Sequence, residues 1–147
     1  MLKAVIIDSS AVARGLLNTV LIDGGYDVVG QTHTCASGLA LLIKFAPHIV
    51  CIAREQIESG EDVVREIRTN WQKTLIFMVS SELNAATIQN AHAMGVNGFI
   101  VKPFKADTVL NTIRNVVIAM VKRQRAAMAT DGAKPQADGE AGEPGAV

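Results

Sequence analysis

Five short apolar runs alternate along the chain with longer segments in which apolar residues recur every three or four positions. The apolar runs predict buried strands at 3–7, 27–32, 49–53, 75–79 and 98–101. The segments between them predict one helix that ends before Gly24 and others over 36–45, 61–70, 84–94 and 105 to about 124. Strands that alternate with helices favour right-handed crossovers and a parallel sheet covered on both faces, which is a doubly wound α/β fold.

Composition limits the range of function classes. The chain has 147 residues, 49% of them hydrophobic, which is enough for one domain with a closed core. Fourteen basic and fourteen acidic residues give no net charge, so neither nucleic acid nor a membrane surface is an expected partner. Cys35 and Cys51 lack the spacing of a zinc or disulfide site, and no signal or membrane-spanning run is present, so we expect a cytoplasmic protein.

The end of the chain differs in composition from the rest. From residue 125 onward it is small, polar and rich in Gly and Pro, and it cannot bury enough apolar area to offset chain entropy. We therefore expect one folded domain over 1–124 and a disordered tail over 125–147.

The residues at the carboxyl ends of the strands carry the candidate chemistry, because ligands of open parallel sheets bind there. Asp8 and Ser9 follow the first predicted strand, and Ala53 ends the third, with Glu55 two positions later. Ser80 follows the fourth strand. Lys102 and Pro103 follow the fifth.

The stretches "AVIIDSSAVAR", "PHIVCIAREQ", "FMVSSE" and "AMGVNGFIVKPF" resemble the receiver domain of bacterial response regulators across residues 2–122. The resemblance implies a flavodoxin-like, CheY-like (βα)5 fold with strand order 2-1-3-4-5. It also implies an acidic pair, a phosphoryl-accepting aspartate, a Ser or Thr, a switching aromatic and a Lys-Pro pair. The positions that match are Asp8 for one acid, Ser80 for the hydroxyl, Phe99 for the aromatic, and Lys102 with Pro103.

Three positions depart from the family pattern. Ser9 replaces the second acid, Ala53 replaces the phosphoacceptor, and Ile57 replaces a loop proline. An alanine methyl offers no nucleophile, so the family's aspartyl phosphate cannot form at 53.

The same departures bear on a metal site. With two acids missing we expect no cofactor and only weak binding of magnesium, which prefers carboxylate oxygens. Asp8 is expected to pair with Lys102, and the alternative is a metal held by Asp8 with Glu55 turned inward.

Several roles stay open at the level of sequence. Ser80 either bonds the next turn or takes part in switching, and Phe99 belongs either to the core or to a switch. In the family, the output surface is the helix after the fourth strand, the fifth strand and the last helix. Leu110, Ile118 and Val121 lie outside the core-facing stripe of the last helix, so they indicate a partner or dimer contact, or else an under-packed helix end. The basic residues Lys122, Arg123 and Arg125 suit a helix C-terminus.

We therefore expect a non-enzymatic, receiver-like module that acts by phosphorylation-independent contact with signalling proteins. A histidine kinase or a downstream effector is the expected kind of partner, and a homodimer through the last helix is an alternative. Two other functions remain open: a phosphorelay receiver that uses Asp8 or Glu55 as acceptor, and a flavodoxin-like cofactor-binding domain.

Overall fold

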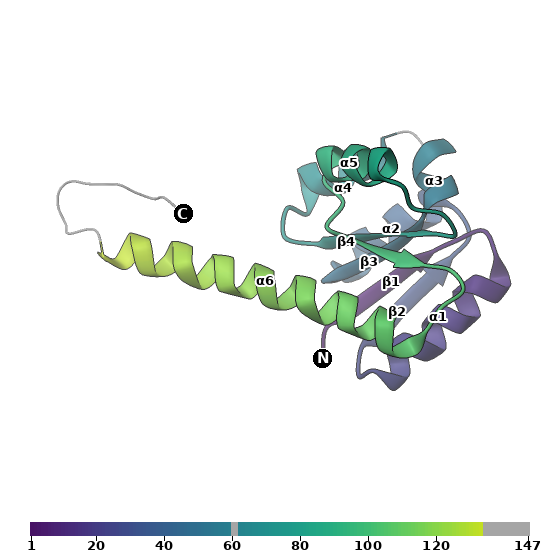
Figure 1. Ribbon diagram of the computed structural model, residues 1–147, viewed down its shortest axis with the longest axis horizontal. Helices are drawn as coiled ribbons and strands as arrows, with labels where there is room; N and C mark the ends of the chain where they lie inside the picture. Colours follow the sequence, from purple (N-terminus) through teal and green to yellow (C-terminus); the bar gives the residue numbers. More distant parts are fainter. Residues whose placement is uncertain (60–61, 134–147) are drawn as a thin grey trace. The chain divides into compact units, whose positions relative to one another are not determined.

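A computed structural model describes residues 1–59 and 62–133 of the chain and contains a five-stranded, all-parallel sheet (Figure 1). The strand order is β2-β1-β3-β4-β5. The strands are β1 (Lys3–Ile7), β2 (Asp27–Thr32), β3 (Ile49–Ala53), β4 (Leu75–Ser80) and β5 (Gly98–Val101). The predicted doubly wound fold and its strand order are therefore confirmed.

Helices cover both faces of this sheet (Figure 1). They are α1 (Ala11–Asp23), α2 (Cys35–Phe45), α3 (Arg54–Ser59), α4 (Val63–Asn70), α5 (Ala85–Met94) and α6 (Ala106–Ala133). On one face lie α1 and the first turns of α6, whereas α2, α4 and α5 lie on the other. Among the described residues, no helix is both long enough and apolar enough to cross a membrane.

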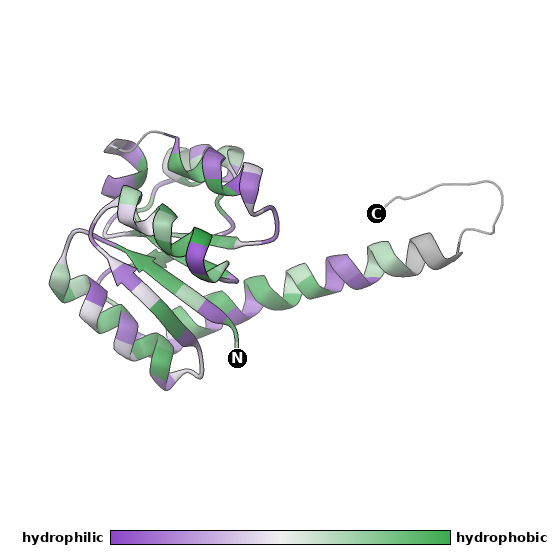
Figure 2. Ribbon diagram, turned by 180° about the vertical axis from the view of Figure 1, so that it is seen from behind, coloured by the Kyte–Doolittle hydropathy of each residue, from purple (hydrophilic) through white to green (hydrophobic). Residues whose placement is uncertain are grey.

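Side chains of alternate strand residues feed two separate core layers, as expected for a sheet buried on both sides. Val50 and Ile52 of β3 join the cluster under α2, α4 and α5, while the intervening Cys51 points to the opposite face. Burial raises the pKa of the Cys51 thiol to about 12. Hydrophobic residues dominate β1 and β3, whereas hydrophobic and hydrophilic residues alternate along the helices (Figure 2).

Capping residues at the helix ends explain where the helices start and stop. The Ser10 hydroxyl accepts the backbone N–H of Ala13 and caps α1. The Asn84 side chain accepts from Thr87 in the same way at α5, which ends at Gly95 with φ 114°, a left-handed conformation suited to glycine.

Helix α3 lies between the predicted strand over 49–53 and the predicted helix over 61–70, where the sequence analysis placed no helix. It begins at Arg54, directly after the last residue of β3, and buries Ile57 against the core. Arg54 and Glu58 form an ion pair of 2.7 Å at i,i+4 spacing, which stabilises a single helical turn. A proline at position 57 would remove a backbone donor from this helix, so the departure from the family pattern at Ile57 is compatible with α3.

Helix α6 continues beyond the predicted end near Gln124 and reaches Ala133. Residues 125–133 of the predicted disordered tail thus belong to α6, and the remainder of that tail, 134–147, lies outside the described residues. Ala126, Ala127 and Met128 are strong helix formers, which explains the extension. The chain divides into one compact unit over Met1–Ile113 and a second that begins at Arg114 within this helix.

Candidate functional site

The carboxyl ends of four strands meet at one edge of the sheet, which we call the carboxyl edge. Asp8 directly follows β1, Ala53 ends β3, Ser80 ends β4 and Lys102 follows β5. The parallel register places Ala53 beside Val79, next to the end of β4. The fold thus brings together the strand-end residues that the sequence indicated.

Asp8 is a buried carboxylate whose two oxygens both have partners. Its side chain Oδ2 lies 3.1 Å from Nζ of Lys102, and its Oδ1 accepts the backbone N–H of Ser10 at 2.9 Å. Only 4% of the residue is exposed. The ion pair with Lys102 that the sequence predicted is therefore present.

A second cation near Asp8 was not singled out from the sequence. Nη1 of Arg14 in α1 donates to the backbone carbonyl of Asp8 at 2.6 Å. Its placement follows from the N-cap at Ser10, because Arg14 lies one helical turn further along α1. Asp8 is consequently held by two basic side chains, Lys102 through the carboxylate and Arg14 through the carbonyl.

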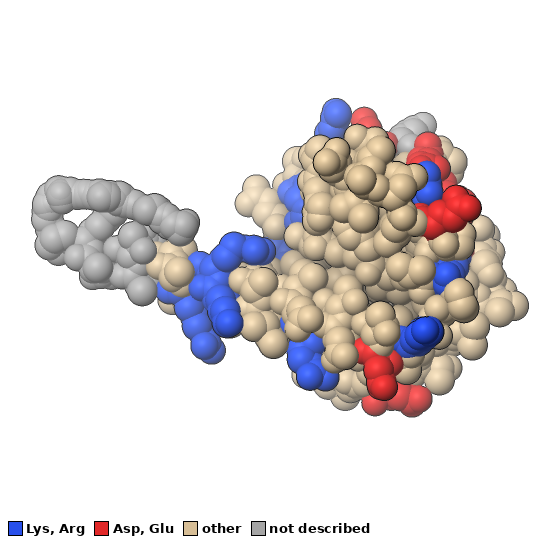
Figure 3. Space-filling view, viewed as in Figure 1, with Lys and Arg blue, Asp and Glu red and all other residues tan. Residues whose placement is uncertain are grey.

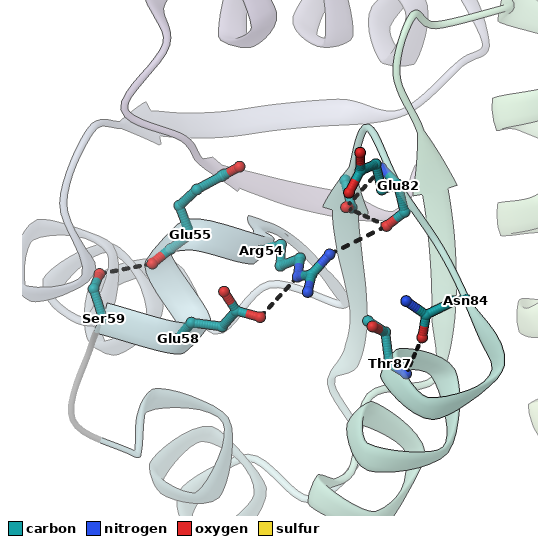
Figure 4. Close-up of polar contacts among 8 residues, drawn as sticks. Arg54, Glu55, Glu58, Ser59, Glu82, Asn84 and Thr87 are labelled. Carbon is teal, nitrogen blue, oxygen red and sulfur yellow. Dashed lines mark hydrogen bonds and ion pairs between the residues drawn. The ribbon is translucent and has the colours of Figure 1, made fainter.

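The end of β3 presents no reactive atom. Ala53 is fully buried, and its side chain is a methyl group. Ser9 and Glu55 are both exposed, whereas Asp8 is buried. The backbone carbonyl of Glu55 accepts the Ser59 hydroxyl at 2.6 Å within α3 (Figure 4).

The oxygen donors at this edge do not fit a resident magnesium ion, which the family implies. Magnesium is usually held by one or more carboxylates whose charge is available to the ion. Here the Asp8 carboxylate is compensated by Lys102, and the Glu55 side chain is exposed. Across the residues that the structure describes, no three His, Cys, Asp or Glu side chains gather in a way that could hold a metal.

Ser80 closes the turn after β4 instead of facing the end of β3. Its Oγ donates to the carbonyl of Glu82 at 2.7 Å and accepts the N–H of the same residue at 3.1 Å. Of the two roles left open by the sequence, the bond to the next turn is the one that this structure contains.

Arg54 reaches from the start of α3 to the same turn (Figure 4). Its Nη1 lies 3.4 Å from the Glu82 carbonyl, and its Nε bonds Glu58. The hydrogen bond and charge of Glu58 raise the pKa of Arg54, so its guanidinium remains charged. The i,i+4 spacing of Arg54 and Glu58 in the sequence could have indicated their ion pair.

Phe99 is half-buried and packs against the core cluster. The ring of His92 meets it edge-on, with 5.1 Å between centroids, and Nδ1 of His92 lies 3.0 Å from the carbonyl of Val96. His92 thus has a defined contact, which the sequence did not indicate.

An apolar groove of about 530 Å³ adjoins Phe99, between β5 and the first turns of α6. Pro103, Lys105, Val109 and Thr112 also line it. The groove lies on the surface that the resemblance assigned to output.

The three extra apolar residues of α6 have different environments. Leu110 is half-buried and packs so closely on Gly24 that a Cβ there would overlap its side chain. Val121 is half-buried as well, and Ile118 is 43% exposed. Leu110 therefore packs within the compact unit over Met1–Ile113. The absence of a side chain at Gly24 makes room for it.

Comparison with known proteins identifies the family to which the chain belongs. Residues 4–114 match the model of the response regulator receiver domain. The chain is 27% identical over 116 residues to the chemotaxis protein CheY of Bacillus subtilis (strain 168), covering 78% of this chain and 97% of that protein. It is 26% identical over 115 residues to CheY of Thermotoga maritima, with 78% and 96% coverage.

Solved structures agree with this result. The chemotaxis response regulator CheY4 of Vibrio cholerae superposes with a TM-score of 0.70 at 26% identity, covering 79% of this chain and 98% of that one. NtrX from Brucella abortus gives 0.76 at 25% identity, covering 87% of this chain and 30% of that one. The chain belongs to the response regulator receiver domain family of two-component signalling.

Proposed function

We propose that this chain is a receiver domain that signals by binding other proteins and does so without being phosphorylated at the end of β3. The observation that carries the proposal is Ala53, which stands fully buried where the family pattern has its phosphoacceptor. A methyl group cannot attack phosphorus, so the usual aspartyl phosphate has no attachment point.

The charges around Ala53 support the same proposal. Asp8 is already neutralised by Lys102 at 3.1 Å, and Arg14 adds a second cation nearby. Binding magnesium would require the cation to displace Lys102 from a buried carboxylate, which costs free energy. We infer that the domain uses no magnesium and catalyses no reaction.

Binding is the activity that the remaining surface supports. The groove beside Phe99 and Val109 offers apolar walls with Lys105 among its lining residues. Because such a groove can bury apolar area of a partner, we propose that a signalling protein of the same pathway docks there. A histidine kinase and a downstream effector are the two kinds of partner we consider.

A phosphorylated form with a non-standard acceptor is the second candidate, and the exposure of Glu55 favours it. Its carboxylate lies two residues beyond Ala53 and is open to solvent. Asp8 is a poorer acceptor, because both of its carboxylate oxygens are already bonded and it is only 4% exposed.

Intact mass spectrometry separates the two candidates. The protein is incubated with acetyl phosphate and magnesium, and we expect no added phosphoryl group. A single phosphoryl adduct that disappears in Glu55→Gln or Asp8→Asn would overturn the first proposal in favour of the second. A domain with the family's usual acceptor, incubated in parallel, shows that the donor is active.

A further inference from the structure

Three basic residues of the second half of α6 form what we call the cationic strip: Lys122, Arg123 and Arg125. All three are exposed. Their helix does not end at Arg125 but continues to Ala133, so Lys122, Arg123 and Arg125 lie outside the last turn. The helix dipole, which acts within the last turn, therefore does not explain them.

The cationic strip also has no acidic partner within its own helix. The positions three and four residues away from each of its members hold no Asp or Glu. In the described part of the chain, the ion pairs are those of Arg54, Arg65 and Lys102, all outside the strip. Lys122 and Arg125 are at i,i+3 spacing, where like charges destabilise a helix slightly.

Figure 3 shows the basic side chains gathered on this half of α6. Figure 2 shows the same stretch as a hydrophilic band across the helix. Within one short segment there is thus a concentration of positive charge in a chain that has no net charge. A surface of this kind attracts an anionic partner.

The complementary charge lies in the same chain, in residues 134–147. This segment contains Asp138, Glu140 and Glu143 against a single basic residue, Lys134. It also contains Gly139 and Gly142, which permit reversals of chain direction.

The segment is long enough to return to the strip. Arg125 lies about 12 Å from Ala133 along the helix axis, at ~1.5 Å per residue. The chain from Ala133 to Asp138 can span up to about 17 Å, at ~3.4 Å per residue. By the same measures Lys122 lies about 16 Å away and Glu140 can reach about 24 Å.

We propose that the acidic segment 138–143 docks on the cationic strip of its own α6. The contacts are exposed ion pairs, individually weak, so docking is reversible and sensitive to salt. An acidic surface of another protein would compete with the segment for the strip. The docked segment therefore lowers the apparent affinity of the strip for such a partner. This inference does not depend on the phosphorylation chemistry at Ala53.

Other anionic occupants fit the strip less well. The helix over Ala106–Ala133 contains no Phe, Tyr or Trp, which a single-stranded nucleic acid would use for stacking and a membrane interface for anchoring. A tethered acidic segment, in contrast, is present at high local concentration.

The test is NMR of the full chain, with the amide signals of Gly139, Gly142 and Gly145 as reporters. We expect these signals to shift between low salt and about 0.5 M NaCl, where screening acts within a few ångströms. In the variant K122Q/R123Q/R125Q they should take their high-salt positions already at low salt. Glutamine is a good helix former, so circular dichroism should show the same helix content in the variant.

A matched control removes three exposed cations elsewhere, in K3Q/K73Q/K105Q, and should leave the tail signals as in the unmodified chain. The proposal is overturned if the tail signals at low salt are the same in the unmodified chain and in K122Q/R123Q/R125Q, or if the control moves them as much. Signals that depend on protein concentration would mean that the tail binds another molecule, and would also overturn it.

Discussion

Single residues decide the chemistry at the carboxyl edge. Ala53 removes the attacking oxygen, and the contact between Lys102 and Asp8 satisfies a carboxylate that would otherwise be buried and unpaired. Arg14 contributes a bond to the backbone of the same residue. The charge of the Asp8 carboxylate is thus compensated by a protein group.

Glycines show the effect of single residues on packing. Gly38 is buried in α2, and a Cβ there would overlap Cδ1 of Ile7, whereas Gly15 in α1 has open space around it. We expect Gly38→Ala to lower the free energy of unfolding by about 1–2 kcal/mol, since overpacking outweighs the better helix propensity.

Gly15→Ala is the matched control, and it should raise the same quantity by about 0.5–1 kcal/mol, because it adds helix propensity without a clash. Urea denaturation measures both. An equal gain in the two variants would show that α2 shifts away from β1 without cost.

At the scale of elements, α3 and the turn after β4 form one connected unit. Arg54 belongs to α3, and Glu82 belongs to the turn, while Ser80 at the end of β4 bonds both backbone groups of Glu82. The position of the turn is therefore fixed by groups of the protein itself.

We expect Ser80→Ala to loosen this turn. Loss of the bond from the Glu82 N–H should speed its hydrogen exchange by about threefold to tenfold, the equivalent of one ordinary hydrogen bond. Amide exchange followed by NMR provides the measurement. Ser81→Ala, at the exposed neighbouring position, should leave the rate unchanged, and an unchanged rate in Ser80→Ala as well would show that another group holds the turn.

At the scale of the whole molecule, the carboxyl edge affects stability as well as chemistry. Putting aspartates at Ser9 and Ala53 would place new carboxylates near the buried Asp8, and like charges in such a site destabilise the fold. We expect S9D/A53D to lower the melting temperature by several degrees without magnesium, and magnesium to restore part of the loss.

The neutral variant S9N/A53N separates charge from size. It should melt at one temperature with and without magnesium. If S9D/A53D also fails to respond to magnesium, then the geometry of the edge, and not only its charge, has departed from that of a metal-binding receiver.

The strands and most helices could be predicted from the sequence, because buried strands are short apolar runs and helix ends carry caps such as Asn84 and Gly95. Two elements were not predicted correctly. Helix α3 is a short segment with one buried residue, Ile57, which gives no periodic pattern. The end of α6 depends on Ala126 and Ala127. Alanine is a strong helix former, but its small side chain gives no apolar pattern that would distinguish these residues from the Gly- and Pro-rich stretch that follows.

By itself the sequence determined the order of strands and helices and the absence of a nucleophile at Ala53, because periodicity and residue identity are local properties. Only the tertiary structure decided which groups meet. The contact of Asp8 with Lys102 was expected from the sequence. The tertiary structure alone shows the bonds of Arg14 to Asp8 and of Ser80 to Glu82. The choice among partners depends on side-chain direction and on distances across separate strands, which no local pattern encodes.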